Sequence, residues 1–207
     1  MILIGQYDSP FVRRVALAMD LHGVSFEHRP WSTFGDADAL AAFNPLRRVP
    51  TLVLDDGEVL IESFAILDWL DERAGSGRAL IPQHGPQRRA ALKICALATG
   101  LADKAVSLLY ERLLHSETSP VWIARCRTQI ADVLTALETA HPGAYWFGAA
   151  MGHADIAVSC AIRFTREAHP DLFEPARWPA LDRHAARCEA TEPFRRLCQP
   201  LIPPGSA

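Results

Sequence analysis

The chain has 207 residues, of which 49% are hydrophobic and 22% charged, a balance typical of an ordinary soluble globular protein with one large or two small domains. Its formal net charge of −3 disfavours a surface that binds nucleic acid or another polyanion. We expect no membrane span, because no uncharged apolar run of about 18 residues occurs, and no signal peptide, because the first residues lack a basic stretch.

The chain contains five cysteines, widely spread and never in a CxxC pair: Cys95, Cys126, Cys160, Cys188 and Cys198. This odd number and wide spacing favour reduced thiols in a cytoplasmic compartment over a disulfide framework or a zinc site. Cys126 and Cys160 fall on apolar faces of predicted helices, so we expect them to be buried as small hydrophobic side chains. The eight histidines show no metal-ligand spacing, and we expect no metal.

The first part of the chain alternates between strand-like and helix-like segments. Short β-rich runs predict strands over residues 2–4 and 25–29. Apolar residues at helical spacing predict a helix over residues 10–22. A shorter helix over residues 36–43 is expected to end before Pro45, since proline disfavours helical backbone at the preceding residue.

The stretch from Thr51 to Ile61 predicts a β-hairpin, in which two β-rich runs flank the turn Asp55-Asp56-Gly57. A further helix is expected over residues 63–74. The order β-α-β-α-β-β-α predicts a parallel βαβ half, which the hairpin completes to a mixed sheet. The unusual feature is Val49-Pro50 at the mouth of the hairpin, because proline cannot donate a ladder hydrogen bond.

Glycine and proline crowd into residues 75–86, which indicates an irregular connection, and strand signals vanish after it. Helical periodicity then predicts helices over residues 86–115, 119–140, 153–168 and 178–190, before a proline-rich tail. We therefore expect an α/β domain over residues 1–76, a linker over 77–85 and an all-helical domain over 86–207.

Three short motifs lie at turns that such a sheet brings to one end. In "YDSPFVRRV" (7–15), Ser9 is expected at or beside the N-cap of the first helix, with Pro10 in its first turn. Val49-Pro50 opens the third strand, and Glu62-Ser63 opens the third helix, with Ser63 as its N-cap. A group at the start of the first helix faces the positive end of the helix dipole, which favours an anion.

In their order and spacing, "SPFVRRV", "FNPLRRVPTL" and "ES" resemble the glutathione transferase superfamily, whose N-terminal domain is thioredoxin-like. The helical half adds "GHADIAVSCAIRF" (152–164), which looks like the family's buried helix motif with Gly152 in place of the usual Ser or Thr cap. There Asp155 is expected to bind backbone N–H groups and to serve folding, not catalysis. The Ser-Pro in the first loop is most similar to bacterial members related to the omega-like and zeta-like classes.

The resemblance implies that the first domain binds glutathione. The Val49-Pro50 bond would be cis, so that the backbone groups of Val49 pair with the cysteinyl backbone of the tripeptide. Glu62 would attract the ammonium of the γ-glutamyl end, and Ser63 would bind its carboxylate at a helix start. Arg48 would lie near the glycyl carboxylate, and Arg47 is the alternative for that role.

The resemblance assigns thiol activation to Ser9, whose hydroxyl would donate a hydrogen bond to the glutathione thiolate. Tyr7 is the rival, since some classes use an N-terminal tyrosine. Ser9 is favoured because it directly precedes the Pro-Phe-Val start of the helix, and it would not itself be a covalent nucleophile. A serine where omega-like members have cysteine removes mixed-disulfide chemistry and leaves thiolate addition or substitution.

The second substrate would be a small hydrophobic electrophile, bound between the two domains against an apolar wall. The candidate residues of this wall are Tyr7, Phe11, Trp31, Phe34, Tyr110 and Leu113. The family further implies a cytoplasmic homodimer that uses glutathione as a substrate and needs no metal or redox cofactor. Neither nucleic acid nor a membrane is an expected partner.

Two other functions remain open. One is glutathione-dependent isomerisation of the maleylacetoacetate type, although the first loop lacks the "SSCS"-like residues of such enzymes. The other is a non-catalytic member that uses the fold as an interaction module. Retention of Ser9, Val49-Pro50 and Glu62-Ser63 disfavours that second alternative.

Overall fold

The computed structural model of the protein describes residues 1–204. The chain divides into two compact units, and the first holds Met1–Leu80 together with the described residues from Glu192 to 204. The second unit is Ile81–Thr191. Every residue predicted to bind glutathione therefore lies in the first unit.

A four-stranded mixed sheet forms the centre of the first unit. Its strands are β1 (Ile2–Ile4), β2 (Glu27–Arg29), β3 (Thr51–Val53) and β4 (Val59–Ile61), in the order β2-β1-β3-β4. β1 pairs with β2 in the parallel direction, whereas β3 pairs antiparallel with both β1 and β4. The predicted topology is confirmed, although β2 is shorter than the strand expected over residues 25–29.

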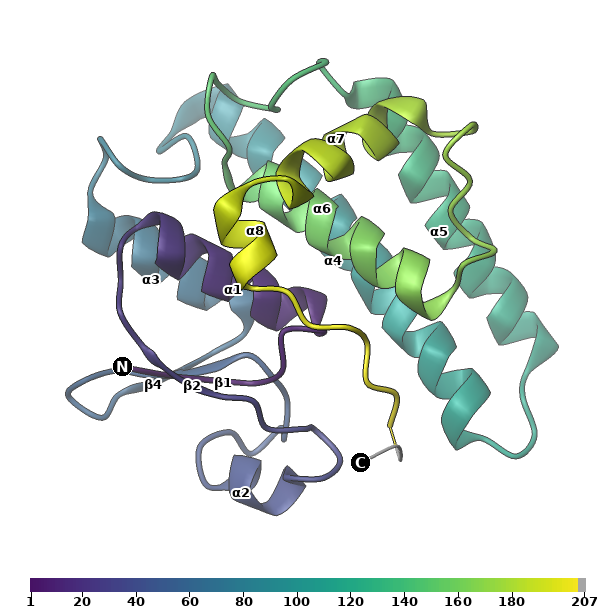
Figure 1. Cartoon of the computed structure of the whole chain (residues 1–207), viewed down its shortest axis with the longest axis horizontal. Helices are drawn as coiled ribbons and strands as arrows, with labels where there is room; N and C mark the ends of the chain where they lie inside the picture. The colour runs from purple at the N-terminus through teal and green to yellow at the C-terminus, as the bar shows by residue number, and fades with distance from the viewer. Residues whose placement is uncertain (205–207) are drawn as a thin grey trace. The chain divides into compact units, whose positions relative to one another are not determined.

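Three helices accompany this sheet: α1 (Pro10–Leu21), α2 (Ala37–Ala41) and α3 (Ser63–Ala74). Figure 1 shows α1 and α3 over one face of the sheet and α2 on the other side. The core of the unit consists of buried aliphatic side chains, among them Leu3, Ile4, Val15, Leu52, Ile66 and Leu70. α2 is shorter than the helix predicted over residues 36–43, because the chain already turns after Ala41.

The loop between α2 and β3 is organised by Asn44, a polar residue that is only 1% exposed. Its side-chain amide donates to the carbonyl oxygen of Arg48 at 2.9 Å and to Oγ1 of Thr51 at 3.2 Å. Its Oδ1 accepts from the N–H of Leu46 at 3.0 Å. A buried amide that satisfies both ends of one loop fixes the backbone that leads into β3.

Gly5 follows β1 at a point where the backbone of the first unit is packed too closely for a side chain. A Cβ at this position would lie 2.5 Å from Cγ2 of Val12 and 2.8 Å from Cβ of Val49. The φ angle of Gly5 is 130°, in the region that favours glycine. This contact brings the loop before α1 directly against the residue that precedes Pro50.

The C-terminal part of the chain departs from the prediction, which placed all of residues 86–207 in the helical domain and ended the last helix at 190. A further helix, α8 (Glu192–Arg196), belongs to the first unit, and Figure 1 shows it beside α1. Arg13 of α1 is 2% exposed and donates to the carbonyl oxygens of Phe194 and Leu197, each at 2.8 Å. Five residues are too few to show helical periodicity, so no sequence pattern indicated this helix.

The second unit consists of α4 (Gly85–Leu114), α5 (Pro120–Ala140), α6 (His153–Ala168) and α7 (Pro179–Glu189). These four helices match the predicted ones to within one residue at each end. Cys126 and Cys160 are 0% and 2% exposed, which confirms their predicted burial. The predicted α/β part and helical part of the fold are therefore both present.

Buried and half-buried polar groups fasten the helices of the second unit to one another. Asp155 accepts from the N–H of Gly152 at 2.9 Å and from the N–H of Trp146 at 3.1 Å, which confirms its predicted structural role. Glu138 of α5 accepts the first free N–H groups of α7, those of Ala180 and Leu181, at 2.8 and 2.9 Å. A carboxylate at a helix start satisfies backbone donors and complements the helix dipole.

A cluster of rings surrounds Asp155. His141 contacts the edges of Trp146 and His184, with ring centroids 4.5 and 4.9 Å apart. Burial, reinforced by the neighbouring His184, lowers the pKa of His141 to about 4, and burial lowers the pKa of His184 as well. Burial raises the pKa of Asp155. The folded unit thus favours neutral imidazoles at this place.

Replacing Gly5 with alanine should lower the free energy of unfolding by about 2 kcal/mol or more, since a left-handed backbone strain and an overpacking cost add at one residue. Chemical denaturation of wild type and G5A measures the difference. Gly57→Ala, with φ of 91° and nothing within 4 Å of the added Cβ, isolates the backbone cost. Equal losses in both variants would contradict the role of the close contact.

Stability should fall as the pH drops from about 6.5 to about 4, the window set by the lowered pKa of His141. In that window the unfolded chain takes up protons that the folded unit refuses, whereas the raised pKa of Asp155 acts in the opposite direction. His141→Phe keeps a ring against Trp146 and should flatten this dependence. The matched control is His84→Gln, at an exposed histidine, and an equal slope in H141F and H84Q would refute the explanation.

Candidate functional site

The strand register gathers the three predicted motifs at one edge of the sheet. Here the edge is the one formed by the last residues of β1 and β4 and the first residue of β3. Ile4 of β1 lies opposite Thr51 of β3, and Thr51 lies opposite Ile61 of β4. Because these strands alternate in direction, β1 and β4 end where β3 begins. The loop after Ile4, the residues before Thr51 and the residues after Ile61 therefore all emerge at the same edge.

Ser9 is the N-cap of α1, as predicted, and its Oγ accepts from the N–H of Val12 at 3.4 Å. Pro10 occupies the first turn, where its missing N–H leaves no hydrogen bond unmade. A serine hydroxyl carries one proton and two acceptor lone pairs, so capping leaves the proton for another acceptor. This geometry suits donation to an anion at the positive end of the α1 dipole.

Tyr7 lies in the same loop, and its ring stacks on that of His28, with centroids 3.9 Å apart and 3° between the planes. His28 in turn donates from Nε2 to the carbonyl oxygen of Gly5 at 2.8 Å. Burial, followed by the negative charge of Asp20, raises the pKa of Tyr7 to about 12. The phenol stays protonated at neutral pH, so Tyr7 can donate a hydrogen bond but cannot act as a base.

The Val49–Pro50 peptide bond is cis, as the resemblance implied. Among the described residues, none forms a hydrogen bond with the N–H or the C=O of Val49. Pro50 itself is buried, whereas Val49 is half-buried. The main chain at Val49 therefore resembles an unpaired strand edge, which can add an extended peptide.

Two neighbouring arginines in the loop before Val49 have different partners. Arg48 lies 3.5 Å from Oε1 of Glu62, an ion pair that joins this loop to the start of α3. Arg47 pairs instead with Asp38 of α2 at 2.7 Å. The geometry favours Arg48 over Arg47 as the arginine that belongs to the site.

The start of α3 corrects one prediction, since Ser63 is the first helical residue and Glu62 is the N-cap. Glu62 has φ of 68°, an unusual backbone conformation for a residue other than glycine, so the helix cannot begin before Ser63. Strained backbone of this kind concentrates at functional sites. The sequence carried no signal for it.

Arg14 contacts the candidate site at the start of α3, and the sequence analysis did not name it. It is 2% exposed, its Nη1 lies 3.5 Å from Oγ of Ser63, and its guanidinium stacks over the ring of Phe64 at 4.7 Å. A buried cation directly behind Ser63 raises the positive potential at the start of α3. The only available signal was the paired arginine in "SPFVRRV", which gives no indication of which arginine faces which helix.

The predicted wall residues of the electrophile pocket are divided between the units. Phe11 and Trp31 are half-buried in the first unit, in the first turn of α1 and after β2, and Phe34 is 45% exposed beyond Trp31. Tyr110 and Leu113 lie in the last turns of α4, where Leu113 is 47% exposed. That these residues line one pocket stays a prediction.

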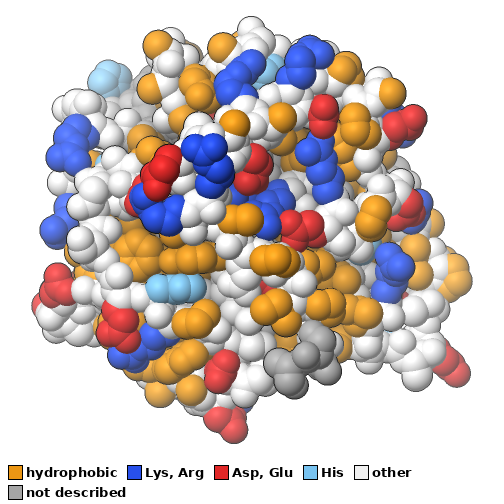
Figure 2. All heavy atoms as spheres, viewed as in Figure 1, with side chains coloured by type: hydrophobic (Ala, Val, Ile, Leu, Met, Phe, Trp, Pro, Cys, Tyr) orange, Lys and Arg blue, Asp and Glu red, His pale blue; other side chains and the backbone are white. Residues whose placement is uncertain are grey.

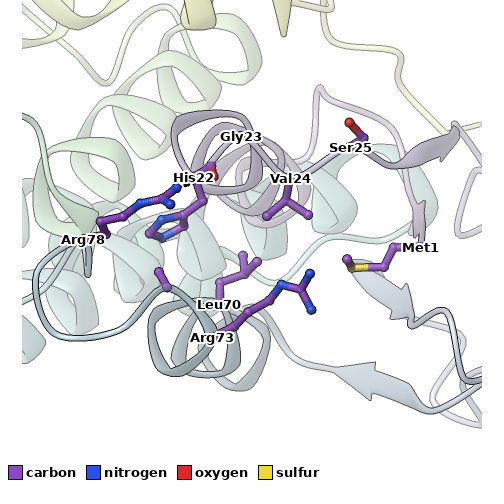
Figure 3. Close-up of a pocket in the computed structure, with 9 residues that line it drawn as sticks. Met1, His22, Gly23, Val24, Ser25, Leu70, Arg73 and Arg78 are labelled. Carbon is purple, nitrogen blue, oxygen red and sulfur yellow. Dashed lines mark hydrogen bonds between the residues drawn. The ribbon is translucent and has the colours of Figure 1, made fainter.

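A separate pocket of about 360 Å³ lies at the other end of α1, among residues such as His22, Arg73 and Arg78. Figure 3 shows the two arginine side chains on either side of it. Both α1 and α3 end here, so their dipoles present negative carbonyl ends, and Arg78 donates to the carbonyl oxygen of His22 at 2.7 Å. None of the predicted site residues lines this pocket.

The surface drawn in Figure 2 carries lysine and arginine side chains interspersed with aspartate and glutamate. Within residues 1–204, no helix is long and apolar enough to cross a membrane. In the same part of the chain, no group of three or more His, Cys, Asp and Glu side chains is placed to hold a metal ion.

Comparison with protein families gives two matches. The family described as "Glutathione S-transferase, N-terminal domain" matches residues 3–79, and "Glutathione S-transferase, C-terminal domain" matches residues 120–187. The GST-like protein YibF of Escherichia coli K12 is 30% identical over 165 residues, which cover 79% of this chain and 81% of YibF. Maleylacetoacetate isomerase of Pseudomonas aeruginosa PAO1 is 29% identical over 215 residues, covering 95% and 94% of the two chains.

Solved structures resemble the chain over nearly its whole length. A glutathione S-transferase of Methylobacterium radiotolerans, in complex with glutathione sulfonate, has a TM-score of 0.89 and 28% identity, with 97% of each chain covered. A glutathione transferase family member of Pseudomonas fluorescens Pf-5, with bound glutathione, has a TM-score of 0.86 and 29% identity, with 97% of this chain and 99% of that chain covered. The architecture expected from the sequence is thereby confirmed.

Ser9→Ala should lower the free energy of unfolding by about 0.5–1 kcal/mol, because the first turn of α1 loses its side-chain cap. Ser9→Asp supplies another capping oxygen and should keep most of that stability. Urea denaturation of the three proteins tests this, and it also calibrates the activity measurements on the same residue. An S9A protein as stable as wild type would show that the 3.4 Å cap is energetically negligible.

Proposed function

Because this chain belongs to the glutathione S-transferase family, we propose that it binds glutathione and activates its thiolate for attack on small hydrophobic electrophiles. The single observation that carries the proposal is the arrangement at one edge of the first unit. There the N-cap hydroxyl of Ser9, the unpaired main chain of Val49 and the start of α3 at Ser63 emerge together. These are the groups that a peptide with a thiol and a terminal carboxylate requires.

The start of α3 is the proposed site for the γ-glutamyl end. Its first backbone N–H groups have no intrahelical partner, and the helix dipole adds positive potential. The Ser63 hydroxyl would bind the carboxylate, with the buried guanidinium of Arg14 behind it at 3.5 Å. Glu62, exposed and held by Arg48, would attract the ammonium.

The other end of the tripeptide carries the glycyl carboxylate. Arg48 is the proposed partner, because it directly precedes Val49 and its exposed side chain would exchange Glu62 for this carboxylate, whereas Asp38 holds Arg47. The cysteinyl residue between the two ends would pair with the N–H and C=O of Val49. This pairing would direct the sulfur toward the loop that carries Ser9.

Thiol activation then rests on two modest effects. A free thiol has a pKa of about 8.5, so only a few per cent is thiolate at neutral pH. A hydrogen bond from Ser9 contributes about 1 kcal/mol and the α1 dipole about 0.3–1 kcal/mol. Because one pKa unit equals about 1.4 kcal/mol, the bound thiol would ionise about one unit lower, and Ser9 needs no general base.

The reaction would be attack of the sulfur lone pair on an electrophilic carbon, with a leaving group expelled or a double bond saturated. Apolar side chains of the first unit, Phe11 and Trp31, would favour a hydrophobic electrophile. Which carbon compound is the physiological substrate depends on a pocket that stays a prediction. The homodimer and the cytoplasmic location that the family implies also stay predictions.

Glutathione-dependent isomerisation is the second candidate, because the maleylacetoacetate isomerase of P. aeruginosa matches 95% of this chain. In that reaction the thiolate adds to a cis double bond of a diacid and leaves again after rotation, so glutathione is regenerated. The substrate needs cationic partners for two carboxylates. Product analysis separates this from conjugation, because only conjugation consumes the thiol.

Calorimetry should detect binding of glutathione by the wild-type protein, and turnover of chlorodinitrobenzene should fall in Ser9→Ala by about three- to tenfold at neutral pH. That range corresponds to a loss of about half to one unit of thiol pKa shift. Ser9→Thr keeps the hydroxyl and should retain activity, whereas Ser9→Asp keeps the cap and loses the donor.

Three outcomes discriminate among the candidates. Unchanged turnover in S9A removes Ser9 from the mechanism and makes Tyr7→Phe the next variant to measure. Turnover of a maleyl diacid without loss of free thiol favours the isomerase. An absence of glutathione binding by the wild type refutes the proposed function and favours a non-catalytic module.

A further inference from the structure

The last residues of the described chain pass along the loop that carries Ser9. We call residues 197–204 the C-terminal strap. Figure 1 shows this yellow segment running from α8 past the end of the purple segment before α1. Strap and loop belong to the same compact unit. The strap was not among the residues that the sequence analysis connected with the site.

The strap begins at a rigid anchor. Phe194 is fully buried, and the guanidinium of Arg13 lies over its ring, 5.0 Å from the centroid. The same guanidinium donates Nε to the carbonyl oxygen of Leu197 and Nη2 to that of Phe194, each at 2.8 Å. Charge-assisted hydrogen bonds in a buried place are strong, so the start of the strap is fixed against the first turns of α1.

Beyond this anchor, hydrogen bonds join the strap to the residues that immediately precede Ser9. Oε1 of Gln199 accepts from the N–H of Tyr7 at 3.0 Å, in a partly buried position. The N–H of Ile202 donates to Oδ2 of Asp8 at 2.9 Å, in an exposed position. The loop before Ser9 contains no regular secondary structure, so its path depends on such contacts, among them the stacking of Tyr7 on His28 and the hydrogen bond from Ser9 N–H to Gln6 C=O at 3.2 Å.

We propose that Gln199 is a positioning residue for thiol activation, which holds the main chain of Tyr7 and thereby fixes where the hydroxyl of Ser9 points. The inference rests on the proposed function. Gln199 would not touch the sulfur itself, because its amide oxygen is already used by the Tyr7 N–H. The contact at Gln199 is partly buried, whereas the contact of Ile202 with Asp8 is exposed to water.

The reason that a loop contact affects chemistry is geometric. A hydroxyl stabilises a thiolate only when its O–H points at the sulfur, and hydrogen bonds weaken steeply with poor angles. The glutathione backbone would be held by Val49 and the start of α3, which the strap does not contact through any described hydrogen bond. Loosening the strap should therefore change the thiol pKa and kcat, but not the affinity for glutathione.

The test uses Gln199→Met, which keeps the size of the side chain and removes its oxygen acceptor, in the full-length protein. The thiol pKa of bound glutathione is read from thiolate absorbance against pH. We expect it to rise by about half to one unit, and kcat for chlorodinitrobenzene to fall about three- to tenfold below that pKa. The KM for glutathione should change less than about twofold, which a general loss of structure would not produce.

A second variant ends the chain after Cys198 and so removes both contacts while it keeps the Arg13 anchor. It should show at least the pKa shift of Q199M. The matched control is Arg196→Ala, which removes an exposed ion pair with Asp20 just before the strap and should leave the thiol pKa and kcat unchanged.

The outcomes are distinct for the two proposals. A wild type that binds glutathione and ionises its thiol, with Q199M and the shortened chain both identical to it, overturns the role of Gln199 while the proposed function stands. A loss of kcat/KM in Q199M that comes entirely from a higher KM for glutathione also overturns the role of Gln199. A wild type that binds no glutathione overturns the proposed function and, with it, this role.

Discussion

The site depends on the antiparallel pairing of β3 with its two neighbours. The register that sets Ile4 against Thr51 and Thr51 against Ile61 brings three loops, far apart in sequence, to one edge. Two of these loops pack directly against each other where Gly5 meets Val49. Only glycine permits this close approach, because a Cβ at Gly5 would collide with Val49. A slip of one residue in this pairing would exchange the two faces of β3 and remove the arrangement altogether.

The two ends of α1 and of α3 carry opposite partial charges. Both helices begin at the edge that carries Ser9 and Ser63, where unpaired N–H groups and positive dipole ends favour a thiolate and a carboxylate. The pocket beside Arg73 and Arg78 lies at the carboxyl ends, about 18 Å away along α1. The shape of this pocket alone would suggest a ligand-binding site. The negative C-terminal ends of the helices disfavour an anion there, and the positive N-terminal ends favour an anion at the edge that carries Ser9.

Buried polar side chains fix the positions of the loops and helices around this edge. Asn44 holds the loop that leads into β3, Arg14 reaches the hydroxyl of Ser63, and Arg13 fastens the C-terminal strap to α1. All three residues are at most 2% exposed, so the hydrogen bonds named here are made with protein groups and not with bulk water. Their partners lie between two and 184 residues away in the sequence, and the distant partners of Arg13 and Arg14 become neighbours only in the fold.

The sequence by itself determined the alternation of strands and helices, the hairpin, the long helices of the second unit and the Ser9 cap, because periodicity, turn residues and capping act over a few positions. It also sufficed to identify the family, through motifs whose spacing survives in the letters. Only the tertiary structure decided that Glu62 has the unusual backbone and caps α3, that Arg48 pairs with Glu62 whereas Arg47 pairs with Asp38, and that α8 and the residues after it return to the first unit. These features arise from contacts between distant segments, and a local sequence pattern carries no record of which segment will become a neighbour.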